Sequence, residues 1–195
     1  MVSDLSAEQV VPLLRGRLGH PYRFVQTCPS TQRLLGENDP EGAVVVADEQ
    51  TEGRGRLGRS WSAPPGRAIL CSVLLRPTPP MPLWPELSLV AGDAVAAAVR
   101  TETGVEAVLS HPNDVLAGGR KLVGVLPEAS QGRVVLGIGA NVNQRANELP
   151  TDTPKPPTSL FVELGHELDR GPLLAAILLE LERHYDEWQE LHRVR

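Results

Sequence analysis

The residues with the clearest chemical potential lie in one glycine- and arginine-rich segment, residues 48–61. Between Gly53 and Arg59 three arginines alternate with three glycines, and the segment ends at Trp61. Glycine lets the backbone approach a ligand closely, and the arginine guanidinium donates paired hydrogen bonds to phosphate or carboxylate. The segment therefore predicts a flexible loop that wraps an anion.

The same segment contains the pattern G-x-G-x-x-G at Gly53, Gly55 and Gly58, which also occurs in dinucleotide-binding folds. That interpretation requires a strand before the glycines and a helix directly after them. Residues 43–47 could form the strand, but residues 59–66 contain two prolines and cannot begin a helix. A dinucleotide site is therefore disfavoured, and a solvated basic surface loop is the alternative to an anion site.

Three further segments carry polar groups that could bind a ligand. Ser30, Thr31 and Gln32 are typical of a helix N-terminus, which favours an anion or a carbonyl, although simple helix capping is the alternative. Residues 110–114, Ser-His-Pro-Asn-Asp, are typical of an ordinary turn. Lys121 opens a predicted strand, where a lysine is usually solvated. None of these segments alone identifies a site.

The elements that must position these segments follow from hydrophobic periodicity and turn residues. Ser6 and Gln9 form a capping-box pattern at the start of the first helix, and Leu34 and Leu35 are expected to point inward. Hairpins combined with non-alternating helices favour an α+β domain with a mixed sheet. We expect helices over 6–18, from 30, over 85–101 and 171–190, strands over 22–27, 43–47, 68–76, 105–109, 115–117, 121–128 and 134–139, and a surface loop over 144–158.

Composition sets the class of protein. The 195 residues are 41% hydrophobic and carry a net charge of −5, which fits a globular domain and argues against general nucleic-acid binding. Cys28 and Cys71 are the only cysteines, and two isolated thiols suit a reducing compartment. No signal peptide, membrane span or metal-ligand cluster is recognisable in the sequence. We therefore expect a cytoplasmic enzyme.

The order and spacing of the polar segments resemble the catalytic domain of biotin–protein ligases, which share a superfamily with lipoate ligases. The resemblance runs from about residue 24 to residue 143, and its specific parts are the glycine- and arginine-rich loop and the strand beginning Arg120-Lys121-Leu122-Val123-Gly124. It implies a class II aminoacyl-synthetase-like α+β fold, with a mixed, largely antiparallel sheet flanked by helices. The supporting parts are Ser30-Thr31-Gln32, Gln50, Pro112-Asn113-Asp114 and residues 137–143.

The resemblance implies a reaction in two steps. The biotin carboxylate attacks the α-phosphate of ATP and gives biotinyl-5′-AMP and pyrophosphate. Mg²⁺ is expected to enter with ATP and not to occupy a metal site formed by the protein alone. A lysine amine of a biotin carrier protein then attacks the mixed anhydride. The implied residues are Arg54, Arg56, Asp114 and Lys121 for catalysis, Ser30, Thr31, Gln32, Gln50, Arg54, Gly55, Arg56, Lys121 and Gly124 for biotin, and Gly53, Arg56, Trp61, Asn113 and Asn141 for ATP or the adenylate.

The sequence also departs from this family. Members usually have Lys-Trp before Pro-Asn-Asp, whereas Ser110 and His111 occupy those positions here, so a cation and a large ring are lost. We expect this to affect catalytic efficiency more than the fold. Residues 1–20 are too few for the helix-turn-helix domain of many members, and no SH3-like strands are recognisable after residue 145. We therefore expect one catalytic domain over residues 1–195, without operator DNA or a membrane as a partner.

Three other interpretations stay open. A relative in the same fold could act on lipoate or octanoate, and Gln50 favours biotin only weakly. Ser110 and His111 favour a degenerate protein that binds biotin or its adenylate without catalysis. A nucleic-acid module could use Trp61 for stacking, against which the acidic net charge argues. The apolar stripe of the final helix could pack on the domain or form a homodimer contact.

Overall fold

The computed structural model describes residues 3–193 and contains one seven-stranded sheet, in the order β1-β2-β3-β7-β6-β5-β4. β1 and β2 pair in parallel, and every other neighbouring pair is antiparallel. This arrangement confirms the predicted α+β class with a mixed, largely antiparallel sheet. The strands are β1 (Tyr22–Cys28), β2 (Val44–Gln50), β3 (Ala68–Leu75), β4 (Ala107–Ser110), β5 (Asp114–Ala117), β6 (Arg120–Ser130) and β7 (Arg133–Asn141).

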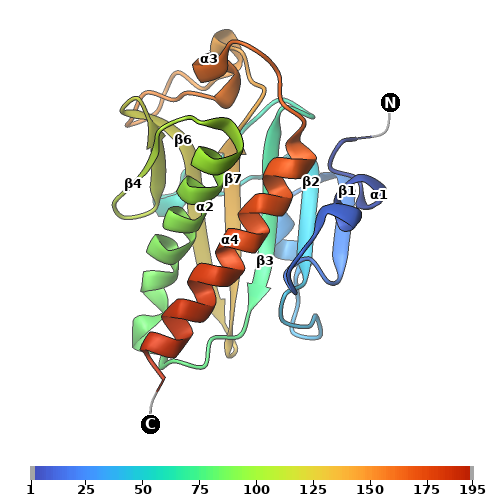
Figure 1. The fold of residues 1–195 in the computed structure, drawn as a ribbon, viewed down its shortest axis with the longest axis vertical. Coiled ribbons are helices and arrows are strands. Elements are labelled where there is room, and N and C mark those ends of the chain that lie inside the picture. Colours follow the sequence, from blue (N-terminus) through green and yellow to red (C-terminus); the bar gives the residue numbers. More distant parts are fainter. Residues whose placement is uncertain (1–2, 194–195) are drawn as a thin grey trace.

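Two long helices cover one face of the sheet. α2 (Leu87–Thr103) and α4 (Arg170–Leu191) lie side by side across it (Figure 1). α2 ends at Gly104, whose φ of 71° gives the left-handed C-cap that glycine adopts without a Cβ penalty. The predicted apolar stripe of the last helix is confirmed and packs into the core, so it is not free for a dimer contact. Its members are Leu174, Ile177, Leu178, Leu181 and Tyr185.

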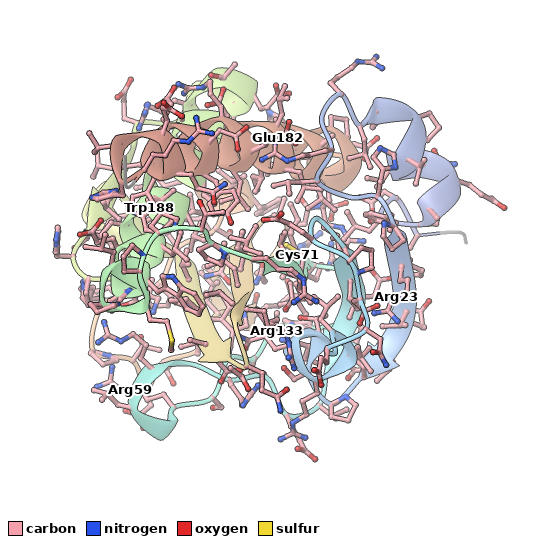
Figure 2. The ribbon with its side chains drawn as sticks, turned by 90° about the horizontal axis from the view of Figure 1, so that it is seen from below. Arg23, Arg59, Cys71, Arg133, Glu182 and Trp188 are labelled. Carbon is pink, nitrogen blue, oxygen red and sulfur yellow. The ribbon has the colours of Figure 1, made fainter. Side chains whose placement is uncertain are left out.

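The two faces of the sheet have different surroundings, as the side chains of the buried strand β2 show. Side chains alternate between the faces of a strand. Val44 and Val46 join the large core beneath the helices, whereas Val45 belongs to a small second cluster on the opposite face. This cluster covers only part of that face, and the loop that carries Arg59 lies on the same side (Figure 2). The face opposite the helices therefore has room for a site.

The first predicted helix is wrong in both length and capping. α1 (Ala7–Val10) continues as a 3-10 turn over Val11–Leu13 and ends there, because Pro12 has no N–H to continue the helical ladder. The Ser6 hydroxyl caps nothing and has no hydrogen-bond partner among the described residues. The capping-box pattern was thus a false signal.

Three smaller differences follow from local geometry. The segment after Ser30 is a 3-10 turn, Thr31–Leu34, in which Leu34 is exposed, whereas Leu35 directly after it is buried. β4 begins at Ala107, two residues later than predicted. α3 (Leu160–Leu164) was not predicted, since five residues are too short for a helical period to show. Within residues 3–193, none of the helices is both long and apolar enough to cross a membrane.

Candidate active site

A cavity of about 750 Å³ opens on the sheet face opposite α2 and α4. Its size is within the range of ordinary ligand sites. It brings together residues from β6, β7, the glycine- and arginine-rich loop, the turn before β5 and the connection after β7. Every site residue predicted from the sequence lines this cavity except Gly53, which contributes to loop geometry instead.

Glycines form the floor of the cavity because larger residues would collide with side chains that lie on it. A Cβ at Gly139 of β7 would lie 2.5 Å from the Trp61 ring, and one at the paired Gly124 of β6 would lie 2.8 Å from it. A Cβ at Gly137 would lie 2.9 Å from the side chain of Gln32. The glycines thus let Trp61 and Gln32 rest directly on the sheet.

The glycine- and arginine-rich loop closes on itself. The backbone N–H of Trp61 donates to the Gly53 carbonyl at 2.9 Å, and that of Gly55 donates to the Arg59 carbonyl at 2.7 Å. A Cβ at Gly53 would lie 2.2 Å from the Trp61 carbonyl, so only glycine fits there. Leu57 at the tip has a φ of 58° and is 85% exposed. The loop is therefore a short irregular hairpin over the cavity.

Two loop arginines have fixed partners on the sheet side. Arg54 pairs with Glu128 of β6 at 2.6 Å. The Nη1 of Arg56 donates to the Oδ1 of Asn113 at 3.2 Å, and the Nδ2 of Asn113 donates to the Val125 carbonyl at 2.8 Å. Asn113 therefore orients Arg56 and ties it to the β6 backbone.

Asp114 holds a pair of lysines at the other wall. Its two carboxylate oxygens accept from Lys121 at 2.8 Å and from Lys155 at 2.9 Å. Burial by itself would raise the pKa of Asp114, but the hydrogen bonds and charges of the two lysines outweigh it and lower the pKa below 3.8. Lys121 also lies 5.5 Å from the centre of the Trp61 ring. Lys155 was not predicted as a site residue, because it lies in a proline-rich connection without a recognisable motif.

A buried polar chamber lies at the β1–β3 end of the cavity. The backbone N–H and hydroxyl of Thr31 donate to the Gln50 side-chain carbonyl at 2.7 and 3.0 Å, and the same hydroxyl lies 2.7 Å from that of Ser72. Ser30 is 1% exposed. Gln32 is also buried there, and its amide donates to two strand carbonyls at 3.0 and 3.2 Å. The chamber suits a neutral, polar group.

The side chain of Asn141 is engaged within the protein. Its amide donates to the Thr158 carbonyl at 2.9 Å, and its carbonyl accepts from Gln144 at 2.8 Å. It therefore fixes the connection after β7 at the rim of the cavity.

The lining has an excess of positive charge although the whole chain carries −5. Arg54, Arg56, Arg59, Lys121 and Lys155 line the cavity, against the carboxylates of Asp114 and Asp152. Among residues 3–193, no group of three or more His, Cys, Asp or Glu side chains is placed to hold a metal ion. The arrangement can bind a multiply charged anion beside a neutral polar group.

Comparison with known proteins agrees with this geometry. The chain is 38% identical over 180 residues to the bifunctional ligase/repressor BirA of Bacillus subtilis, a match that covers 88% of this chain and 55% of that protein. It is 42% identical over 162 residues to the biotin–[acetyl-CoA-carboxylase] ligase of Mycobacterium tuberculosis, covering 80% of this chain and 59% of that one. The chain thus spans little more than half the length of these relatives.

A solved structure shows the same fold. The biotin protein ligase of Aquifex aeolicus in complex with biotin and ATP superposes with a TM-score of 0.78 at 35% identity, over 87% of this chain and 72% of that one. The model of the Biotin/lipoate A/B protein ligase family matches residues 24–144, which include the polar chamber, the loop, the lysine-bearing strand and the glycine floor. By fold, cavity and sequence, this chain belongs to that family.

Proposed function

We propose that the protein is an ATP-dependent biotin–protein ligase, which forms biotinyl-5′-AMP and transfers biotin to a lysine of a biotin carrier protein. The observation that carries the proposal is the pairing of a strongly cationic cavity with a buried amide and hydroxyl chamber. ATP supplies the anion and the ureido head of biotin supplies the polar group. The Aquifex aeolicus relative in complex with biotin and ATP supports the same pairing of ligands.

In the first step, a carboxylate oxygen of biotin bonds to the α-phosphorus of ATP, and the bond to the pyrophosphate oxygen breaks. Negative charge on the phosphoryl oxygens must be met by donors that are already in place. Arg56, oriented by Asn113, and Lys121, held by Asp114, are such donors. The loop hairpin would exclude water from the reacting atoms.

The binding roles follow the two ends of the cavity. Ser30, Thr31 and Gln50 would bind the biotin head in the polar chamber, and Gln32 would position the adjoining strands. Arg54, Gly55 and Gly124 would border the biotin carboxylate. Trp61 and Asn141 would border the nucleotide, with Trp61 supported by the glycine floor.

In the second step, a neutral lysine amine of the carrier attacks the carbonyl carbon of the mixed anhydride. The amide bond forms, the bond from that carbon to the phosphate oxygen of AMP breaks, and the proton released by the amine passes to solvent. The low pKa of Asp114 keeps it ionised, so it can accept a hydrogen bond from the incoming amine. The name of the Mycobacterium tuberculosis relative supports a carboxylase carrier as the acceptor. We also propose that the described residues act as one catalytic unit.

Mg²⁺ would enter with ATP. Asp114 is shared by two lysines and Glu128 is paired with Arg54, so these carboxylates are already committed to cations. The phosphates of ATP would therefore supply the main ligands of the ion.

The buried, unpaired thiols of Cys28 and Cys71 are consistent with a reducing, cytoplasmic location.

A ligase for octanoate or lipoate is the second candidate, since the family includes both classes by its description. The hydroxyl and amide groups around Thr31 and Gln50 favour biotin, because its ureido head can exchange hydrogen bonds with them and an alkyl chain cannot.

The direct test mixes the protein with ATP, Mg²⁺, radiolabelled biotin and an unmodified biotin carrier domain. We expect label on the carrier, and a loss of about 10²–10³ in rate for Arg56→Ala or Lys121→Ala, because each removes a charge-stabilising donor. Arg183→Ala, on the exposed side of α4, is the matched control and should keep full activity. Binding of biotin without any transfer would move the protein to the non-catalytic class.

A further inference from the structure

Lys155 is built into the cavity although it comes from the long connection after β7. Its ammonium lies 2.9 Å from Asp114 and 3.1 Å from the hydroxyl of Ser110. The side chain is 34% exposed and lines the cavity. Lys155 is thus a cation that faces the ligand space and is held in place by Asp114 and Ser110.

The backbone around Lys155 is pinned to the strand that carries Lys121. The N–H of Lys121 donates to the Pro156 carbonyl at 2.7 Å, and the N–H of Thr158 donates to the Lys121 carbonyl at 2.8 Å. The hydroxyl of Thr153 donates to the Lys155 carbonyl at 2.8 Å. These hydrogen bonds fix the backbone on both sides of Lys155, so the connection holds the ammonium groups of Lys121 and Lys155 close together.

The composition of the chain singles out the same pair. Lys121 and Lys155 are the only lysines in the sequence, among 19 basic residues. Every other basic residue is arginine, and both lysines contact one carboxylate. A lysine ammonium is a compact charge with three donors, so it can hold Asp114 and a second anion at once.

We propose that Lys155 is a further catalytic residue, which contacts the phosphate groups of ATP and supplies the cation that Ser110 does not. The inference rests on the proposed function and adds a residue to it. Asp114 neutralises one of the two lysines, so the pair presents one net positive charge to the α-phosphate region. As the oxygen–phosphorus bond to pyrophosphate breaks, that charge stabilises the departing oxygen.

The kinetic test measures biotin-dependent exchange of labelled pyrophosphate into ATP, which reports the first step alone. We expect Lys155→Met to lower the exchange rate by roughly 10- to 100-fold, less than a fully enclosed donor would because this side chain is partly exposed. Arg145→Met removes one positive charge from the same connection, outside the cavity, and should stay within twofold of the wild type.

A rescue variant distinguishes the loss of the Lys155 charge from a defect in folding. Because Ser110 lies 3.1 Å from the Lys155 ammonium, a lysine introduced there can place its charge in the same region. Ser110→Lys combined with Lys155→Met should therefore recover most of the lost exchange. Exchange by Lys155→Met within twofold of the wild type, with Arg56→Ala inactive, would overturn the role of Lys155 and leave the proposed function standing.

Trace reductive methylation followed by mass spectrometry tests the contact without turnover. Only two lysines need to be read, so each modification can be assigned directly. ATP or inorganic pyrophosphate should slow methylation of Lys155 several-fold. Equal methylation with and without these probes would refute the contact. Protection without any formation of biotinyl-5′-AMP would support the phosphate contact while showing that the proposed ligase function is wrong.

Discussion

At the scale of single residues, Asp114 sets the charge of one wall of the site. Its folded pKa lies below its ordinary value of 3.8, so its ion pairs stabilise the protein fully above that pH. This contribution is lost as the pH falls through the lower, folded pKa. Asp114→Asn should therefore cost roughly 1–3 kcal/mol of unfolding free energy at pH 7.

Urea denaturation of the wild type and Asp114→Asn at a series of pH values from 7 to 3 checks this prediction. The difference in unfolding free energy should be constant at neutral pH and shrink below pH 3.8. A difference that grows as the pH falls would contradict the ion-pair account.

Gly139 is the residue whose size matters most directly. Gly139→Ala would place a methyl group 2.5 Å from the Trp61 ring and displace it from the floor. We expect the rate of adenylate formation to fall roughly 10- to 100-fold, because misplacing a group of the site by about 1 Å has effects of that size.

Gly36→Ala is the matched control, since its nearest contact would be an ordinary 3.8 Å. Pyrophosphate exchange measures the rates, and circular dichroism verifies that both variants are folded. Wild-type exchange by Gly139→Ala would show that the position of Trp61 is not important.

At the scale of elements, the glycine- and arginine-rich loop is held to β6 through the Arg54–Glu128 pair. Glu128→Gln weakens this anchor and should increase tryptic cleavage within the loop, where Arg54, Arg56 and Arg59 are the available sites. Glu167→Gln, which breaks a 2.5 Å pair with Arg67 elsewhere, is the control. Mass spectrometry locates the cuts, and equal loop cleavage in both variants would contradict the anchoring role.

Among the elements, some helices could be predicted from the sequence and others could not. Strongly periodic segments such as α2 and α4 were predicted nearly to their observed ends, because burial of one face dictates their pattern. α1 was predicted too long because Pro12 ends the regular hydrogen bonding.

Within the site, the glycine- and arginine-rich loop and Lys121 could be recognised from local patterns and from the resemblance. Lys155, Glu128 and Ser72 could not be predicted, since they meet their partners across 41, 74 and 41 positions of the sequence. Only the folded sheet brings these residues together.

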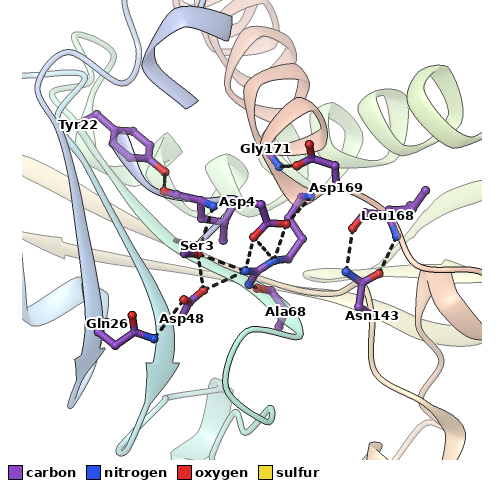
Figure 3. A network of polar contacts seen from close by, with 12 residues as sticks. Ser3, Asp4, Tyr22, Gln26, Asp48, Ala68, Asn143, Leu168, Asp169 and Gly171 are labelled. Atoms are coloured by element: carbon purple, nitrogen blue, oxygen red, sulfur yellow. Dashed lines mark hydrogen bonds and ion pairs between the residues drawn. The ribbon is translucent and has the colours of Figure 1, made fainter. Parts of the chain in front are cut away.

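At the scale of the whole molecule, Arg170 joins three distant parts of the chain, and Figure 3 shows Asp4, Asp48 and Ala68 close together where these parts meet. It is buried at the start of α4, pairs with Asp4, donates to the Ala68 carbonyl at 2.8 Å and lies 3.0 Å from Asp48. Asp48 is on β2, two residues before Gln50. The network therefore connects the N-terminal segment and the last helix to the strand that supplies the polar chamber.

Arg170→Met should destabilise the fold by about 3–5 kcal/mol, because it leaves a buried carboxylate without its partner. Arg183→Met, which removes an exposed arginine from the same helix, should leave the urea midpoint unchanged. A similarly small effect of Arg170→Met would show that the network contributes little to stability.

Formation of an acyl-adenylate of biotin in the cavity can be measured directly. We would incubate the protein with ATP, Mg²⁺ and equal concentrations of biotin and octanoate, and identify the adenylates by mass spectrometry. We expect biotinyl-5′-AMP with little octanoyl-AMP, since the chamber around Thr31 and Gln50 is polar. Octanoyl-AMP as the main product, or the formation of neither adenylate, would contradict it.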